Sequence, residues 1–483
     1  MIMETAPQIK LKPLVDYIDG QVDAPVDKLS AAISNPNTNE PLQPQRATDA
    51  RALERALKAA QKIHDQGTWR NLPVAERVKI LEQIASRAEQ HLDDIAMAES
   101  LTTGVVIHQS RALSRLIPLA FRQAARQMQQ GGRMIALSDN VRLGRIPWGP
   151  VVIMSPWSSS AASAAQKVAS ALAAGCPVIL KPSQWSPHSC GILAEAITSA
   201  GLPTGTFQLV NGGSQVSAKL VRDARIRAVT FSGSLEEGRT IAQLCAESLK
   251  PVQLELDGVN PFIVMEDAAI EQAAEGIITA LTTMNGQWNR GLGRLLIHAK
   301  KYHALLNYLL DQLETITIGD SMSPDSELGP LIHSGHLQHV QDIVSKLMTC
   351  GAVVNEARPM DDLSGYFMPP TLITNCPSEY SLEPLLGPVA TVQFYKTDDE
   401  AIALANEPNS AAVAYIFGDD EKQAYGLAQR IQASSISINA VSLLGLHPQV
   451  PQSGWGHSGL NESGIAESFR FFTGTRAIGI AGS

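Results

Sequence analysis

Between residues 151 and 234, short β-branched runs alternate with stretches that favour helices. The predicted strands cover residues 151–154, 177–180, 207–210 and 228–231, and the predicted helices lie at about 168–174, 189–200 and 216–221. Helical crossovers make neighbouring strands parallel, and right-handed crossovers give a doubly wound sheet. The ligand crevice of such a sheet lies beyond the carboxyl ends of its strands. The residues that follow each strand are therefore the candidate binding residues, at 156–158, 181–184, 211–213 and 232–234.

Other parts of the chain extend this α/β pattern. Asp49 precedes a predicted helix that ends near Gln66, and an apolar stripe with helical spacing runs from Leu81 to Ile95 through Ile84, Ala88 and Leu92. A second alternating unit has predicted helices at 268–282 and 302–313 and predicted strands at 294–298 and 436–439. The fold class that these patterns predict is α/β.

Composition excludes several classes of protein. The net charge of −9 and the lack of a basic run argue against a nucleic-acid partner. The five cysteines are scattered and have no CxxC spacing, and the 11 histidines show no metal-ligand spacing, so we expect reduced thiols and no metal site. The start of the chain does not resemble a signal peptide, and no segment is apolar enough to span a membrane. We expect a cytoplasmic protein without a membrane partner.

Residues 454–459 match the dinucleotide pattern GxGxxG, but their context does not fit it. That pattern requires a preceding strand and a following helix N-terminus, whereas residues 447–451 contain two prolines. We expect a loop here.

Several short motifs together resemble one family, the NAD(P)-dependent aldehyde dehydrogenases, and the similarity runs from about residue 35 to 475 in the family's order. The motifs are Pro156-Trp157, Leu180-Lys181-Pro182-Ser183, Phe231-Ser232-Gly233-Ser234, Leu254-Glu255-Leu256, Gly286-Gln287, Leu328-Gly329-Pro330-Leu331, Gly387-Pro388-Val389 and Ser458-Gly459.

The resemblance implies a doubly wound cofactor domain, an α/β catalytic domain and a small oligomerisation region made of strands. The dinucleotide-binding-type domain would comprise residues 1–132, 147–253 and 436–460, and the catalytic-type domain residues 254–435. Oligomerisation segments would be residues 133–146 and 461–483. The family likeness implies a homo-oligomer, dimer or tetramer, or a hetero-oligomer with another protein.

At the catalytic positions the chain departs from the family. Asn289 stands where the family has its nucleophilic cysteine, and Ser158 replaces the asparagine of the oxyanion hole. Glu255 matches the general base. A carboxamide has no thiolate-like form and cannot give a hydrolysable thioester. We therefore expect impaired or absent aldehyde oxidation.

The cofactor side combines retained and altered positions. Trp157, Lys181, Ser183, Gly233 and Ser234 match family positions that contact NAD or NADP. The altered positions are Gln184 and Pro384, where the family has glutamates that bind ribose, Leu386 in place of a phenylalanine, and Asp257 in place of a glycine. Cofactor binding is expected to be weak or absent.

Three functions remain open from the sequence. The first is a non-catalytic family member with a structural, regulatory or subunit-partner role. The second is an active oxidoreductase or other enzyme, with a small aldehyde as a candidate substrate, that uses Glu255 as a base in altered chemistry. The third is a ligand-binding module. No replacement nucleophile is evident, because the chain lacks GxSxG and HExxH motifs and has no cysteine within ten residues of Asn289.

Overall fold

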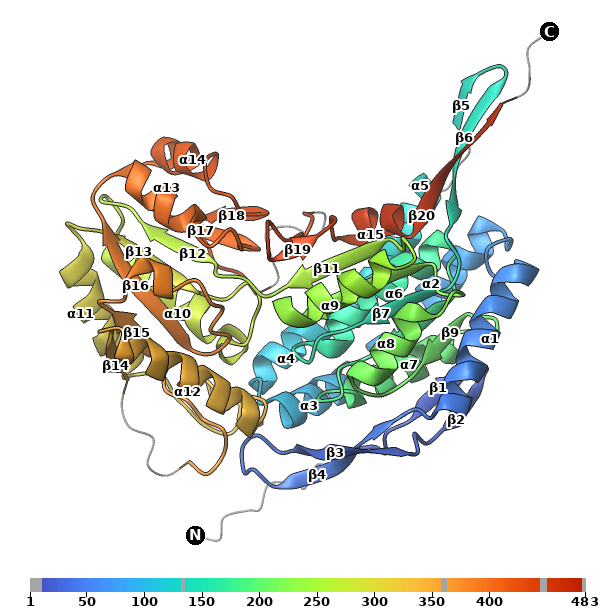
Figure 1. The fold of residues 1–483 in the computed structure, drawn as a ribbon, viewed down its shortest axis with the longest axis horizontal. Coiled ribbons are helices and arrows are strands. Elements are labelled where there is room, and N and C mark those ends of the chain that lie inside the picture. Colours follow the sequence, from blue (N-terminus) through green and yellow to red (C-terminus); the bar gives the residue numbers. More distant parts are fainter. Residues whose placement is uncertain (1–10, 132–134, 358–362, 444–449, 480–483) are drawn as a thin grey trace.

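The computed structural model describes residues 11–131, 135–357, 363–443 and 450–479. Two sheets with helices on both faces form two lobes, and a narrow three-stranded sheet projects beyond the first lobe (Figure 1). This arrangement confirms the predicted α/β class.

The first sheet has eight strands, of which the five central ones are parallel. In spatial order they are β19 (Gly459–Leu460), β11 (Val252–Leu256), β10 (Ala228–Gly233), β7 (Val151–Met154), β8 (Val178–Lys181), β9 (Phe207–Leu209), β1 (Asp16–Ile18) and β2 (Gln21–Asp23). The chain runs outward from β7 through β8 to β9, and then returns to β10 on the other side of β7. The order of the strands therefore reverses between β7 and β10, which is the switch point of a doubly wound sheet.

Helices cover both faces of this sheet because its strands are apolar on both sides. Val151 and Ile153 pack in one core with α2 (Val74–Glu89), α5 (Leu116–Gly131), α6 (Ser160–Ala174) and α7 (His188–Thr198). Val152 and Met154 point to the opposite core, with α1 (Ala50–Gln66), α8 (Ser214–Arg222) and α9 (Leu235–Ala246). Gly175 ends α6 at a φ of 98°, a left-handed conformation in which glycine avoids steric strain.

The stripe from Leu81 to Ile95 belongs to two helices, not to one. The chain leaves α2 after Glu89, His91 has non-helical dihedrals, and α3 (Leu92–Thr103) begins at the next residue. Leu81, Ile84, Ala88 and Ile95 are nevertheless all buried in one core. The prediction of one continuous helix over residues 81–95 was wrong. The residues on both sides of the break are buried in the same core, so the apolar spacing continues although the helix does not.

The second sheet has seven strands, β14 (Val353–Glu356), β15 (Thr371–Thr374), β16 (Val389–Tyr395), β13 (Arg294–His298), β12 (Pro261–Val264), β17 (Val413–Phe417) and β18 (Ser435–Ile438). Apolar residues of α10 (Ile270–Thr282) and α11 (Tyr302–Leu313) pack on one face, and those of α13 (Asp398–Asn406) and α14 (Glu421–Ala428) on the other. A further helix, α12 (Ser334–Thr349), contacts β14.

Two predicted domain boundaries do not coincide with the sheets. β18 pairs with β17, so residues 435–438 belong to the second sheet, whereas the division had assigned residues from 436 onward to the first unit. The boundary at 253/254 falls inside β11, a strand of the first sheet. Strand pairing depends on contacts between distant parts of the chain, and a division made along the sequence cannot show these contacts. The rest of the domain division remains a prediction.

The projecting sheet consists of β5 (Ile135–Ser138), β6 (Val141–Pro147) and β20 (Thr473–Gly479), with β6 in the middle. The resemblance implied strands in the segments 133–146 and 461–483, and these three strands lie there, although residues 132–134 and 480–483 are outside the described part. The remaining α-helices and strands are β3 (Asp27–Ser34), β4 (Pro41–Ala47), α4 (Ile107–Ser114) and α15 (Ile465–Phe471), and two 3-10 turns lie at η1 (Thr283–Gly286) and η2 (Ser378–Tyr380).

Residues 451–458 contain no helix, as expected for the GxGxxG match. No helix of the described residues is long and apolar enough to cross a membrane.

Candidate functional site

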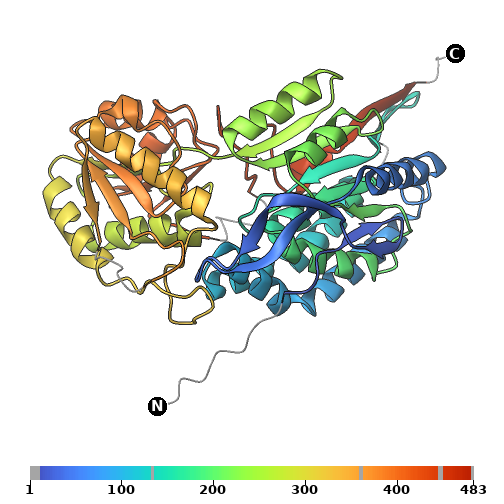
Figure 2. The same ribbon diagram turned by 60° about the horizontal axis from the view of Figure 1, so that its bottom comes forward.

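A cavity of about 710 Å³ is lined by residues of both lobes, which stand side by side in Figure 2. All twelve residues that the sequence singled out for catalysis or cofactor binding line it. They are Trp157, Ser158, Lys181, Ser183, Gln184, Gly233, Ser234, Glu255, Asp257, Asn289, Pro384 and Leu386. The cavity therefore brings together residues that are more than 200 positions apart in the chain.

The switch point of the first sheet explains much of this convergence. Trp157 and Ser158 follow the carboxyl end of β7, Lys181 ends β8, and Gly233 ends β10. Parallel strands place these ends at the same edge of the sheet.

A tightly bonded segment carries Asn289 into the cavity. It begins with the turn η1 (Thr283–Gly286), in which Asn285 has a φ of 57° and its Nδ2 donates to the carbonyls of Gly104 at 2.6 Å and Pro330 at 2.9 Å. Asn260 Nδ2 donates to the Asn289 carbonyl at 2.9 Å. The Asn289 carboxamide itself makes no hydrogen bond with the described residues. Hydrogen bonds therefore fix the backbone at position 289, and the Asn289 side chain is free to contact a molecule in the cavity.

All five cysteines are described, and none lines this cavity. Burial raises the pKa of the Cys176 and Cys190 thiols to about 12 and that of Cys245 to about 11. These thiols are neutral near pH 7, so they cannot take over the role of a reactive thiolate.

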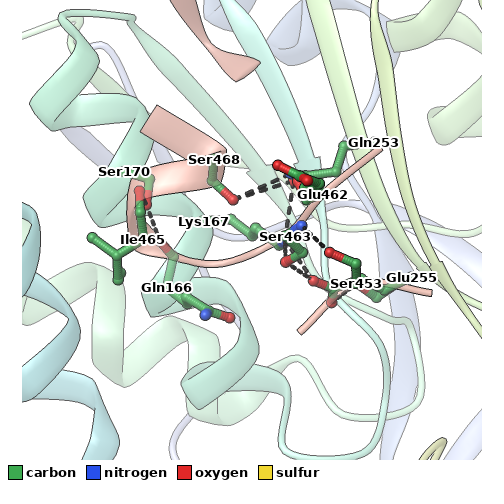
Figure 3. Close-up of polar contacts among 11 residues, drawn as sticks. Gln166, Lys167, Ser170, Gln253, Glu255, Ser453, Glu462, Ser463, Ile465 and Ser468 are labelled. Carbon is green, nitrogen blue, oxygen red and sulfur yellow. Dashed lines mark hydrogen bonds and ion pairs between the residues drawn. The ribbon is translucent and has the colours of Figure 1, made fainter. Parts of the chain in front are cut away.

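Glu255 lies at the cavity wall within a buried polar cluster (Figure 3). Its carboxylate accepts hydrogen bonds from Lys167 Nζ at 2.6 Å, from Ser232 Oγ at 3.0 Å and from Ser463 Oγ. Lys167 Nζ also donates to Gln253 Oε1 at 3.0 Å. Burial raises the pKa of Glu255, but the charge of Lys167 and these hydrogen bonds together hold it below its usual range. Glu255 is therefore an ionised carboxylate, and both of its oxygens accept hydrogen bonds.

Sequence reasoning missed Lys167 and Ser463 as partners of Glu255. A signal for Lys167 was present in the sequence, because a single lysine interrupts the alanine-rich segment that forms α6. The structure shows that its side chain is almost completely buried. Buried lysines are nearly always paired with an acid. Ser463 had no such signal, since the contact depends on the path of the carboxyl-terminal segment.

Lys181 is the residue that best fits a dinucleotide. Its side chain is buried, lines the cavity, and makes no hydrogen bond or ion pair with the described residues. Burial lowers the pKa of its ammonium to about 8. A buried ammonium without a partner is costly, so a ribose hydroxyl or a phosphate at this point would complete its hydrogen bonding.

The neighbouring positions offer fewer contacts. Pro384 and Leu386 have no polar side-chain atom, and Gln184 packs against Gly213. The Ser234 hydroxyl already caps α9, accepting from Glu237 N at 3.3 Å, and the first turn of α9 contains Glu236 and Glu237. These acids oppose a pyrophosphate at this helix end. The residues present therefore fit a dinucleotide mainly through Lys181.

Asp257 and His336 also face the cavity. Burial, with a smaller contribution from Glu237, raises the pKa of Asp257 to about 7. Burial lowers the pKa of His336 to about 4, and its Nε2 lies 2.8 Å from the Leu386 carbonyl, so the ring is neutral and donates there. His336 carried no signal in the sequence. Among the described residues, no group of three or more His, Cys, Asp or Glu side chains could hold a metal ion.

Comparison with known proteins adds independent findings. The model of the aldehyde dehydrogenase family matches residues 25–478. The chain is 30% identical over 455 residues to an aspartate-semialdehyde dehydrogenase (non-phosphorylating) of Halomonas elongata, covering 93% of this chain and 92% of that protein. It is also 30% identical over 455 residues to DhaS of Bacillus subtilis, with coverages of 92% and 91%. A betaine aldehyde dehydrogenase from Staphylococcus aureus, solved in complex with NAD⁺, superposes with a TM-score of 0.91 at 28% identity, covering 97% of this chain and 94% of that one.

Proposed function

Because the chain belongs to the aldehyde dehydrogenase family, we propose that it is a member without thioester chemistry, which serves as a regulatory or structural subunit partner. The observation that carries this proposal is Asn289, which occupies a firmly held position in a cavity that no cysteine lines. The family reaction needs a thiolate that adds to the aldehyde and later leaves as part of a thioester. Asn289 can do neither.

Ser158 and Glu255 support the same proposal. Ser158 lines the cavity in place of an oxyanion-hole amide, and a lost donor of this kind typically costs about 10²–10³ in rate. Glu255 is engaged by Lys167, Ser232 and Ser463, and the charge of Lys167 makes its carboxylate a weaker base toward a water molecule.

An alternative proposal is an enzyme that uses Glu255 as a base for different chemistry on a small aldehyde. The observation in its favour is that Glu255 is ionised and borders the cavity. The competing ion pair with Lys167 at 2.6 Å makes it the second choice.

We propose that a nicotinamide dinucleotide, NAD or NADP, still binds, but weakly. When bound, it supplies a hydride acceptor. Lys181 would hold a ribose hydroxyl or phosphate, and Trp157, Ser183, Gly233 and Ser234 would line its site. Gln184 carries no charge to repel a 2′-phosphate, so discrimination between the two cofactors should be small. The free cysteines support a cytoplasmic location.

The proposal is tested with purified protein, by calorimetry with NAD⁺ and NADP⁺ and by NAD(P)H formation at 340 nm with aliphatic and aromatic aldehydes. We expect weak binding of both cofactors and no turnover. Turnover near the ~10 s⁻¹ of an ordinary enzyme would overturn the loss of catalysis. A sub-micromolar dissociation constant for NAD⁺ would overturn the weak binding.

A further inference from the structure

Arg290, the residue after Asn289, lines the cavity with a cation that forms no ion pair within the described part of the chain. Its Nη2 donates to Ser435 Oγ at 2.7 Å, and its backbone carbonyl accepts from Tyr415 OH at 2.8 Å. These two bonds attach Arg290 to β18 and β17 of the second sheet. Among the described residues, no carboxylate forms an ion pair with its guanidinium.

Arg294, four residues further on, shows how this chain treats a buried guanidinium that has only a structural role. Its nitrogens donate to Glu407 at 2.8 Å, to the Leu404 carbonyl at 2.7 Å and to Ser381 Oγ at 2.7 Å. Burial lowers the pKa of both arginines, but Arg294 has a carboxylate to balance its charge. Arg290 donates to the neutral Ser435, and the charge of Glu255 acts on it only from within the ion pair that Glu255 forms with Lys167. A partly buried cation without an ion pair of its own is costly, so an anion from the cavity would stabilise it.

Glu255 lines the cavity and its charge opposes the lowering of the Arg290 pKa by burial, but neither it nor the other lining acids form an ion pair with Arg290. Glu255 pairs with Lys167 at 2.6 Å, and Asp257, with a pKa raised to about 7 by burial, is partly protonated at neutral pH. Glu236 and Glu237 are exposed on α9.

The wall beside Arg290 is apolar. Trp288, two residues before it, packs with Leu113, Met284 and Leu443, and all four line the cavity. A guanidinium next to such a wall suits a molecule with a charged head and an apolar body. The planar fork of arginine matches a carboxylate with two parallel hydrogen bonds.

We propose that Arg290 anchors the carboxylate of a small organic acid whose aromatic or branched body lies against Trp288 and the adjoining apolar wall. This site differs from the dinucleotide contacts around Lys181. It holds whether or not the chain oxidises aldehydes, because it depends on the charge and shape of the cavity.

The test measures binding of benzoate and of its uncharged isostere benzamide by calorimetry at constant ionic strength, without cofactor or aldehyde. We expect benzoate to bind the wild type at least about tenfold more tightly than benzamide. Arg290→Gln should lose at least about tenfold in benzoate affinity while its benzamide affinity stays the same. Arg290→Lys should be intermediate, because it keeps the charge and loses the fork.

Arg239→Gln is the matched control, since Arg239 also borders the cavity but is exposed on α9, and it removes the same charge. Benzoate affinity should not change in this variant. Equal affinity of the wild type for benzoate and benzamide would overturn the proposal, and this comparison needs no variant to fold. The proposal also fails if Arg290→Gln binds benzoate like the wild type, or if it weakens NAD⁺ as much as benzoate, which would assign Arg290 to the dinucleotide. The aldehyde assay is separate, so failure of either proposal is recognised independently.

Discussion

The side chain at position 289 determines which chemistry the cavity can support, but it is one of several altered parts. Asn289→Cys alone should give little or no aldehyde oxidation, because Ser158 supplies no oxyanion amide and Pro384 no ribose acceptor. When several residues act together in catalysis, restoring one of them recovers little of the rate. Activity should begin only when Asn289→Cys is combined with Ser158→Asn and Pro384→Glu.

The measurement is NAD(P)H formation at 340 nm for the single, double and triple variants. If Asn289→Cys alone reached the ~10 s⁻¹ of an ordinary enzyme, the rest of the site would have been intact. Asp257→Gly in the triple variant should raise the rate further, since it removes a side chain from the cavity.

Lys167 is expected to matter for stability through Glu255. Lys167→Met leaves Glu255 buried without its counter-charge, which should destabilise the protein by about 3–5 kcal/mol in urea unfolding. Lys167→Met combined with Glu255→Gln should recover much of this loss.

The control for Lys167 is Lys58→Met, which breaks the exposed pair with Glu54 at 3.4 Å and should change stability by less than about 1 kcal/mol. Equal effects of the two lysine substitutions would contradict a special role for the buried pair.

At the level of residues, the sequence predicted which residues line the site better than it predicted which residues they contact. Asn289, Glu255 and Lys181 were found from motifs, and they line one cavity. The contacts of Glu255 with Ser463 and of Arg290 with Ser435 join segments more than 100 residues apart. Such contacts depend on how elements pack, and local patterns do not contain that information.

At the level of elements, Glu99 connects α3 to two neighbours and should make their packing sensitive to pH. Its carboxyl accepts from Ala161 N, in α6, at 3.0 Å and from Ser186 Oγ at 3.5 Å, and burial raises its pKa from 4.5 to about 7. Between these values the folded state holds a proton that the unfolded state has released. Stability from Glu99 is therefore present at low pH and is lost as the pH rises through 7.

We expect this group to remove roughly 2–3 kcal/mol of unfolding free energy between pH 5 and pH 8. Glu99→Gln keeps an acceptor for Ala161 N but cannot ionise. Urea unfolding gives the free energy of unfolding of the variant relative to that of the wild type. We expect this difference to be larger at pH 8 than at pH 5 by this amount, in favour of the variant. A wild-type-to-variant difference that is the same at both pH values would refute the role of Glu99. Asp16 and Asp257 also have raised pKa values, and the comparison cancels their contributions.

Element prediction succeeded where local signals determine the structure. The helix α1 begins after Asp49 and ends at Gln66 as expected, and the Asp49 side chain caps it by accepting from Ala52 N. The strand 294–298 and the helix 302–313 also have the predicted bounds. It failed between α2 and α3, where the core preserves apolar spacing across a break. The assignment of β18 to the second sheet likewise follows from its pairing with β17, a tertiary contact.

At the level of the whole molecule, the projecting sheet is the feature that a single chain does not explain. Its outer strands β5 and β20 each have an unpaired edge within the described residues, and Ile135, Leu137 and Ile478 are 60%, 63% and 49% exposed. Open edges with apolar side chains favour pairing with another chain. The location of this sheet at one end of the molecule leaves it accessible (Figure 1).

We therefore predict that the protein is a dimer or tetramer, or a hetero-oligomer with a related chain, and that assembly persists without cofactor. Leu137→Asp combined with Ile478→Asp should shift light scattering at micromolar concentration toward the monomer, because each substitution puts a charge where apolar contact is expected. Val22→Asp is the control, since Val22 is 59% exposed on β2, an edge strand of the first sheet and not of the projecting one, and should leave the assembly unchanged. A wild type that scatters as a monomer would contradict the prediction, and a double variant that stays assembled would assign the interface to another surface.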